Sequence, residues 1–135
     1  MLDCQQISEA LGEFGVCEST ERGTRVTTHC LYPSFEPVSV FIVSSKVGFE
    51  VHDNAGAVTS AWLHGRERAA IGKILAKSAR IYGCDFDKDV ISCRAFEEKG
   101  IYGAILSVAN ASAYAARAAV DKDAEQNEES LAGAN

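Results

Sequence analysis

The chain has 135 residues, of which 47% are hydrophobic and 24% are charged. This length fits one ordinary domain, and the composition excludes an intrinsically disordered chain because it supplies enough apolar side chains for a core. The formal net charge of -6 argues against a protein that binds nucleic acid over its whole surface, and no run of ~18 to 20 apolar residues predicts a membrane span.

The N-terminal part of the chain predicts one helix followed by a turn. In residues 2–14, Ile7, Leu11 and Phe14 recur at the three- and four-residue spacing of one helical face. The polar segment 18–24 contains a glycine and predicts a turn that leads into the first strand.

Three strands are expected next. Residues 25–32 alternate two kinds of side chain and are rich in β-branched residues, which is typical of a strand. Residues 38–43 are almost wholly apolar, which predicts a central strand that is covered on both faces. A short loop leads to residues 47–52, so the three strands form an antiparallel meander that ends in the turn 53–56.

The second half of the chain is mainly helical. Residues 66–82 place their apolar side chains on one stripe, and Gly83 is typical of the residue that ends a helix. Residues 84–93 could form a small hairpin, and alanine-rich residues 101–119 predict a long helix. These elements predict the α+β class: a small antiparallel sheet of three to five strands, with helices packed on one face and a long C-terminal helix.

The acidic charge is concentrated at the C-terminal end. Residues 121–135 hold five acids against Lys122, a net charge of -4, and their only large apolar residue is Leu131. We therefore expect one domain in residues 1–120 and an acidic, flexible tail in residues 121–135.

Several of these segments together carry a resemblance to a known family. They are Arg25-Val-Thr-Thr, the apolar strand Val38 to Val43, Val51-His52-Asp53-Asn54-Ala55-Gly56, Tyr82-Gly83-Cys84 and the last helix. Through them the sequence is similar to the prokaryotic domain of unknown function 1828, over roughly residues 24–117. The resemblance implies a bacterial or phage-encoded accessory protein, often on mobile elements, and it implies no particular activity, cofactor or catalytic residue.

The turn after the third strand holds the first candidate site residues, Asp53, Asn54 and Gly56. Asp53 could bind a cation, but acidic residues at turns more often accept backbone N–H bonds, so we interpret the segment as a structural turn. No carboxylates or histidines recur at a metal-site spacing, and we expect neither a metal nor a cofactor.

The five cysteines are odd in number and lack CxxC spacing, so we expect reduced thiols. Cys84 and Cys93 are the exception. A two-residue turn at Lys88 and Asp89 would place them opposite each other across a hairpin, as a candidate redox pair. Lys-Asp is, however, a poor choice for such a turn.

A thiol-dependent enzyme is an alternative function that the sequence leaves open. Cys30, His52 and Asp53 lie on or next to predicted strands, and a nucleophilic cysteine needs a nearby histidine and an orienting acid. The alternation of the strands puts Cys30 and His52 on different kinds of face, which favours a buried structural cysteine.

A basic stripe on the helix 66–80 is the most distinct surface feature. Few acids accompany it within the helix, so pairs at i and i+4 do not neutralise it. Such a stripe can attract phosphates or an acidic protein surface. Its residues, the candidate partner-binding set, are Arg66, Arg68, Lys73, Lys77 and Arg80.

No convergent catalytic set is apparent, so we expect a non-enzymatic prokaryotic or phage accessory protein that binds a macromolecular partner through the helix 66–80. A protein partner is favoured, a nucleic acid is an alternative through the same stripe, and a homodimer through the alanine-rich helix is another. The sequence lacks a secretion signal, so we expect a cytoplasmic protein without membrane contact.

Overall fold

The computed structural model of the chain describes residues 4–11, 15–21, 23–63, 65 and 68–133. Within these ranges the side chains of residues 6, 8, 10, 11, 15, 68–70 and 122–133 lie outside the description. The elements follow in the order α1 (Cys4–Leu11), β1 (Gly15–Thr20), β2 (Gly23–Leu31), β3 (Pro37–Ser45), β4 (Gly48–His52), α2 (Gly56–Leu63), α3 (Arg68–Ile81), β5 (Asp85–Asp87), β6 (Val90–Ala95), the 3-10 helix η2 (Glu98–Gly100) and α4 (Ile101–Gly133).

The strands form one antiparallel sheet in the order β1-β2-β3-β4-β6-β5. The α+β class is therefore right, but the predicted count of three to five strands is wrong, because this sheet has six. The additional strand is β1, which includes part of the segment 18–24 that the sequence predicted as a turn. Thr20 pairs with Gly23, so the true turn is much shorter. Gly23 has a φ of +119°, and a Cβ there would lie 2.6 Å from the Ile42 carbonyl oxygen.

β5 and β6 form the small hairpin that residues 84–93 suggested. Asp87 pairs with Val90, which leaves Lys88 and Asp89 as a two-residue turn. Both turn residues have positive φ, +50° and +69°, as a primed turn requires. The sheet pairing therefore imposes a backbone conformation that the residue types do not favour.

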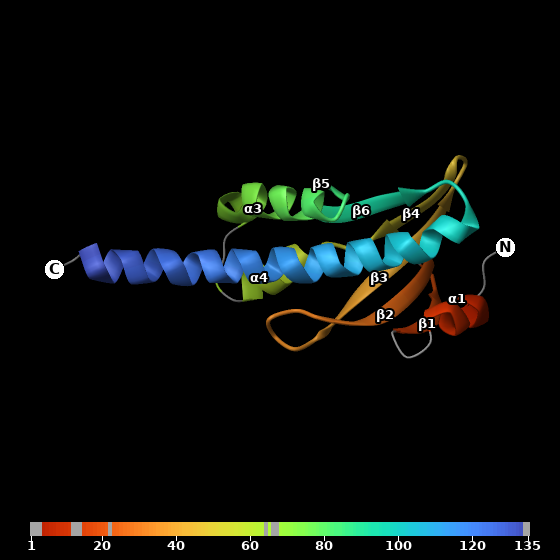
Figure 1. Ribbon diagram of the computed structural model, residues 1–135, viewed down its shortest axis with the longest axis horizontal. Helices are drawn as coiled ribbons and strands as arrows, with labels where there is room; N and C mark the ends of the chain where they lie inside the picture. The colour runs from red at the N-terminus through yellow and green to blue at the C-terminus, as the bar shows by residue number, and fades with distance from the viewer. Residues whose placement is uncertain (1–3, 12–14, 22, 64, 66–67, 134–135) are drawn as a thin grey trace.

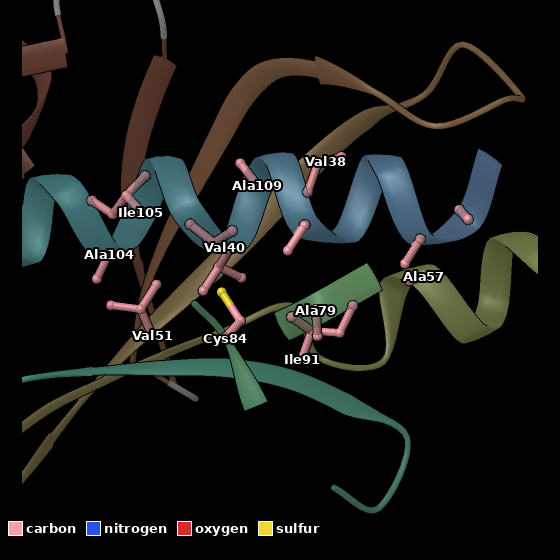
Figure 2. Packing of buried hydrophobic residues seen from close by; sticks show 14 of the residues in the cluster. Val38, Val40, Val51, Ala57, Ala79, Cys84, Ile91, Ala104, Ile105 and Ala109 are labelled. Carbon is pink, nitrogen blue, oxygen red and sulfur yellow. The ribbon is translucent and has the colours of Figure 1, made fainter. Parts of the chain in front are cut away.

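The helices cover one face of the sheet. Val38, Val40 and Ile42 of β3 are buried against this helical layer, whereas Ser39 and Phe41 between them are only partly buried. The predicted burial of residues 38–43 on both faces is therefore wrong. Figure 2 shows the packed layer between the sheet and α4, where alanines of α4 allow a close approach. The labelled residues there include Val38, Val40, Val51, Ala104, Ile105 and Ala109.

α4 is the longest element and lies across the sheet, with α3 on one side and α2 on the other (Figure 1). Its buried stripe runs from Ile101 to Ala119. The backbone stays helical as far as Gly133, so the segment expected to be a flexible tail continues α4 beyond the rest of the fold. Eight of its residues 121–133 are alanine, glutamate, glutamine, lysine or leucine, which are good helix formers.

Candidate functional site

The most elaborate polar site is built around Asp53, at the turn between β4 and α2. Asp53 is only 2% exposed. Its Oδ1 accepts hydrogen bonds from the backbone N–H groups of Ala55 and Ile91, both at 3.0 Å. Its Oδ2 accepts one from the Ala57 N–H at 3.2 Å and one from the Ser112 hydroxyl at 2.7 Å. The carboxylate therefore joins its own turn to β6 and to α4.

Tyr32 extends this network from the end of β2. The single proton of the Ser112 hydroxyl goes to Asp53, so the Tyr32 hydroxyl, 2.8 Å away, donates to Ser112. Burial raises the pKa of Tyr32 well above its ordinary value, and the charge of Asp53 acts in the same direction. Burial also raises the pKa of Asp53, against four donors that lower it. The tyrosine therefore stays protonated and keeps its hydrogen bond.

The turn itself is held in an uncommon conformation. Asn54 and Ala55 have φ values of +50° and +62°, and the Gly56 N–H donates to the Asp53 carbonyl at 2.9 Å. A Cβ on Gly56 would lie 2.0 Å from the Tyr32 hydroxyl oxygen, so only glycine fits beside this tyrosine. Because Ser112 is fully buried and Asp53 nearly so, the geometry of this turn is that of a structural cross-link.

A hollow of about 300 Å³ lies beside the network, between the start of β3 and α2. Tyr32, Phe41 and Leu63 are among its walls. The Phe41 ring stacks on His52 with ring centroids 5.6 Å apart, and His52 Nδ1 accepts the Asn54 N–H at 3.0 Å. His52 is thus held by its neighbours on the sheet face opposite to the helices.

The structure does not bring Cys30 and His52 together. The Cys30 thiol donates to Asn110 Oδ1 of α4 at 3.6 Å, so it points toward the helical layer. His52 alternates with the buried Val51 and lies on the other face of the sheet. Because the sheet separates the two side chains, His52 is not placed to act as a base for the Cys30 thiol.

The basic stripe lies on α3, where the structure describes three of its five side chains. Arg66 lies outside the described residues, and Arg68 is described for its backbone alone. Lys73, Lys77 and Arg80 are exposed, opposite to a buried face that includes Ile71 and Leu75. None of the three cations pairs with a carboxylate of another described residue. The described part of the stripe is thus free to meet a partner.

A hollow of about 730 Å³ adjoins this stripe, between α3 and the strands β4, β6 and β5. Arg80 lines it from α3, and Arg94 lines it from β6. The acids Glu50, Asp85 and Asp87 also line it. Sequence reasoning missed Arg94, because its place in the same hollow as Arg80 depends on the pairing of β6 with β4.

Cys84 and Cys93 meet at the base of the β5–β6 hairpin. Cys84 is 3% exposed, points into the core (Figure 2) and also lines the larger hollow. Cys93 is half-buried on β6, and both are free thiols. Burial raises the pKa of the Cys84 thiol to about 12, with a further contribution from the adjacent Cys93.

Comparisons with family models, with curated proteins and with solved structures find no match for this chain. The resemblance to the domain of unknown function 1828 therefore stays a prediction. In the described part of the chain, no helix is both long enough and apolar enough to cross a membrane. Among the same residues, no three histidines, cysteines or acids gather in a way that could hold a metal ion.

Proposed function

We propose that this protein is a binding module that contacts a partner protein through the exposed face of α3. The observation that carries the proposal is the set Lys73, Lys77 and Arg80, three solvent-exposed cations without a carboxylate partner among the described residues. Cations that the fold itself does not neutralise are available to an acidic surface. The stripe lies on a helix that is anchored by buried Ile71 and Leu75, so it is presented on a rigid element.

The charges around the stripe favour a protein over a nucleic acid. Arg80 and Arg94 share their hollow with Glu50, Asp85 and Asp87, and the whole chain carries a net charge of -6. A nucleic-acid backbone presents one sign of charge only, so these acids would repel it. A protein surface can place acids against the arginines and bases against the carboxylates.

The buried polar network supports a binding role in another way. Asp53 and Ser112, at the centre of this network, are hydrogen-bonded to each other and buried. They hold the sheet to α4 and thereby keep α3, which packs on α4, in place. The proposal thus assigns the buried polar groups to the fold and the exposed cations to recognition. The resemblance of the sequence to the prokaryotic family extends the proposal to a phage or mobile-element accessory protein.

The test is affinity capture from a host lysate with matched charge-reversal variants. Wild type is compared with Lys73→Glu/Lys77→Glu and with a control, Lys46→Glu/Lys99→Glu, which makes the same charge change at exposed positions outside α3. Each capture is repeated after nuclease treatment. We expect a partner that binds wild type and the control, is lost with the α3 variant and persists after nuclease.

Two other outcomes would contradict the proposal. Loss of the partner after nuclease, with a binding affinity that falls steeply with salt, would show nucleic-acid binding instead. Equal capture by wild type and the α3 variant would exclude α3 as the contact surface. Circular dichroism on each variant verifies that any loss of binding does not come from unfolding.

A further inference from the structure

Cys84 and Cys93 occupy facing positions across the β5–β6 hairpin. Asp85 pairs with Ser92 and Phe86 with Ile91, so the next facing positions belong to Cys84 and Cys93. Alternation along β6 puts Cys93 on the same face as Ile91 and Ala95, and both of these are buried. Both cysteines therefore belong to the helix-covered face of the sheet.

The backbone hydrogen bonds show whether Cys84 and Cys93 are a hydrogen-bonded or a non-hydrogen-bonded pair of the antiparallel strands. The carbonyl and the N–H of Ile91 both bond to Asp53, on the β4 side of β6. Cys93 pairs with Val51 of β4 two residues later, so its backbone groups also face β4. The Cys84 N–H donates away from β6, to the Ala79 carbonyl at 2.9 Å.

Cys84 and Cys93 thus form a non-hydrogen-bonded pair. Facing residues in such pairs have Cα atoms roughly 4.5 Å apart, inside the range that a disulfide can bridge. As free thiols, Cys84 donates to the Tyr82 carbonyl and Cys93 to the Arg94 carbonyl, both at 3.8 Å. The remaining cysteines, Cys4, Cys17 and Cys30, are likewise outside any disulfide and provide internal comparisons.

We propose that Cys84 and Cys93 are a modification site, at which a small hydroperoxide converts the two thiols into an intrachain disulfide. Cys93 is the half-exposed member and meets the oxidant first. Its sulfur attacks the peroxide and becomes a sulfenic acid, while the O–O bond breaks and the departing oxygen takes up the proton of the Cys93 thiol, leaving as an alcohol or water.

The second step forms the cross-link. The Cys84 sulfur attacks the Cys93 sulfur, the S–O bond breaks, and the departing hydroxide takes up the Cys84 proton as water. In sum, two thiols and one hydroperoxide give one disulfide, one alcohol (water when the oxidant is hydrogen peroxide) and one water. Burial keeps Cys84 protonated, so this second step is the slow one and the sulfenic acid on Cys93 persists long enough to be trapped.

This disulfide would tie the end of α3 to β6. The Cys84 N–H already bonds to Ala79 of α3, and Arg94 follows Cys93 directly. The cross-link therefore sets the spacing across the hollow that Arg80 and Arg94 share. The proposal depends on the pairing of the two strands alone and stands independently of the binding function proposed above.

The experiment uses the folded full-length chain and hydrogen peroxide. The reduced protein is freed of reductant and treated with peroxide, its remaining thiols are blocked by alkylation, and non-reduced peptides are mapped by mass spectrometry. We expect a linked peptide pair that contains Cys84 and Cys93, with the mass of two hydrogens lost, and its disappearance after dithiothreitol. Cys30, which is half-buried like Cys93, remains an alkylated thiol.

Variants separate the two steps. In Cys93→Ser the link is absent, and in Cys84→Ser the sulfenic acid on Cys93 accumulates and is trapped by dimedone. Cys30→Ser is the matched control and still forms the Cys84–Cys93 link. The wild-type map is decisive even where a variant folds poorly. Two results would overturn the proposal. In one, Cys84 is still alkylated although Cys93 has oxidised beyond the sulfenic acid. In the other, either cysteine is linked to a different cysteine.

Discussion

Two charged regions of this molecule differ in burial and in hydrogen bonding. Asp53 lies 2% exposed and accepts four hydrogen bonds from donors in four parts of the chain. Lys73 and Lys77 lie exposed on α3 and pair with no carboxylate among the described residues. Removing a charge from water is costly unless polar partners replace the water, which explains why the buried charge is fully bonded. The exposed charges keep their water and can exchange it for a partner.

The contrast teaches that stability and recognition are carried by different residues here. A change at the buried network should alter the free energy of unfolding and affect binding only through the fold. A change on α3 should alter binding and leave unfolding nearly untouched. Each prediction below is a way to test this division.

The largest effect is expected from Asp53→Ala. The substitution leaves three backbone N–H groups and the Ser112 hydroxyl without their acceptor in a buried site. We expect the free energy of unfolding to fall by about 3–5 kcal/mol, measured by urea denaturation. Asp85→Ala, at an exposed acid, is the control, and an equal effect of the two substitutions would remove the special role of Asp53.

Gly56→Ala should have the next largest effect. The new Cβ would lie 2.0 Å from the Tyr32 hydroxyl oxygen, which has to move and then loses its bond to Ser112. We expect a loss of about 1–3 kcal/mol in the free energy of unfolding. Gly72→Ala in α3 is the matched control, because a Cβ there meets no atom within 4 Å, and it should stabilise the protein slightly.

A double-mutant cycle can sharpen that result. Tyr32→Phe removes the hydroxyl that a Cβ at position 56 would strike, so part of the Gly56→Ala loss should be recovered in the double variant. Strictly additive effects of the two substitutions would show that the contact between Gly56 and Tyr32 does not limit the turn.

Alkaline pH should weaken the fold through Cys84. Burial and the adjacent Cys93 raise the Cys84 pKa from 9.0 to about 12, so the folded protein holds the thiol proton at a pH where the unfolded chain releases it. The contribution of Cys84 is complete below pH 9.0 and is lost as the pH rises toward 12.

We expect a loss of about 1 kcal/mol per pH unit above this threshold, measured by urea denaturation with reductant present. Tyr32, whose pKa is also raised, adds a loss of the same sign at higher pH. Comparison with Cys84→Ser isolates the cysteine, since that variant should show a shallower dependence from pH 9.0 upward. Identical slopes for the two proteins would contradict the assignment.

The smallest effect on stability is expected from substitutions of the exposed lysines on α3. Lys73→Glu/Lys77→Glu should change the free energy of unfolding by less than about 0.5 kcal/mol, because these side chains are solvated. Thermal unfolding in parallel with Lys46→Glu/Lys99→Glu measures this. A large loss with the α3 variant alone would mean that the stripe supports the fold.

Local patterns predicted the elements with the clearest periodicity. The stripe from Ile101 to Ala119 matches the buried face of α4, and the predicted alternation in β2 matches the alternating burial of that strand. β1 was missed because Glu18, Ser19 and Thr20 are polar residues of an edge strand, and a partner strand is what makes such a segment extended. The two faces of residues 38–43 could not be told apart, since Phe41 and Val43 are as apolar as the buried Val40.

The candidate site shows the same limit. The sequence singled out Asp53, Asn54 and Gly56 because their residue types suit a turn. It had no signal for Tyr32 or Ser112, which lie 80 residues apart and meet only when α4 crosses the sheet. Arg94 was missed for a related reason. The neighbours of the β5–β6 hairpin depend on which strand of the sheet it pairs with.

By itself, the sequence predicted the apolar stripes of α3 and α4, the alternation in β2, and where cations without local partners gather on a helix, because these properties depend on spacing along the chain. Only the tertiary structure decided that β6 pairs with β4 and leaves β5 at the edge. That choice places Cys84 opposite Cys93, and Arg94 in the same hollow as Arg80. Long-range pairing follows from burying the most apolar surface while satisfying every buried polar group, a condition on the whole chain that no local window contains.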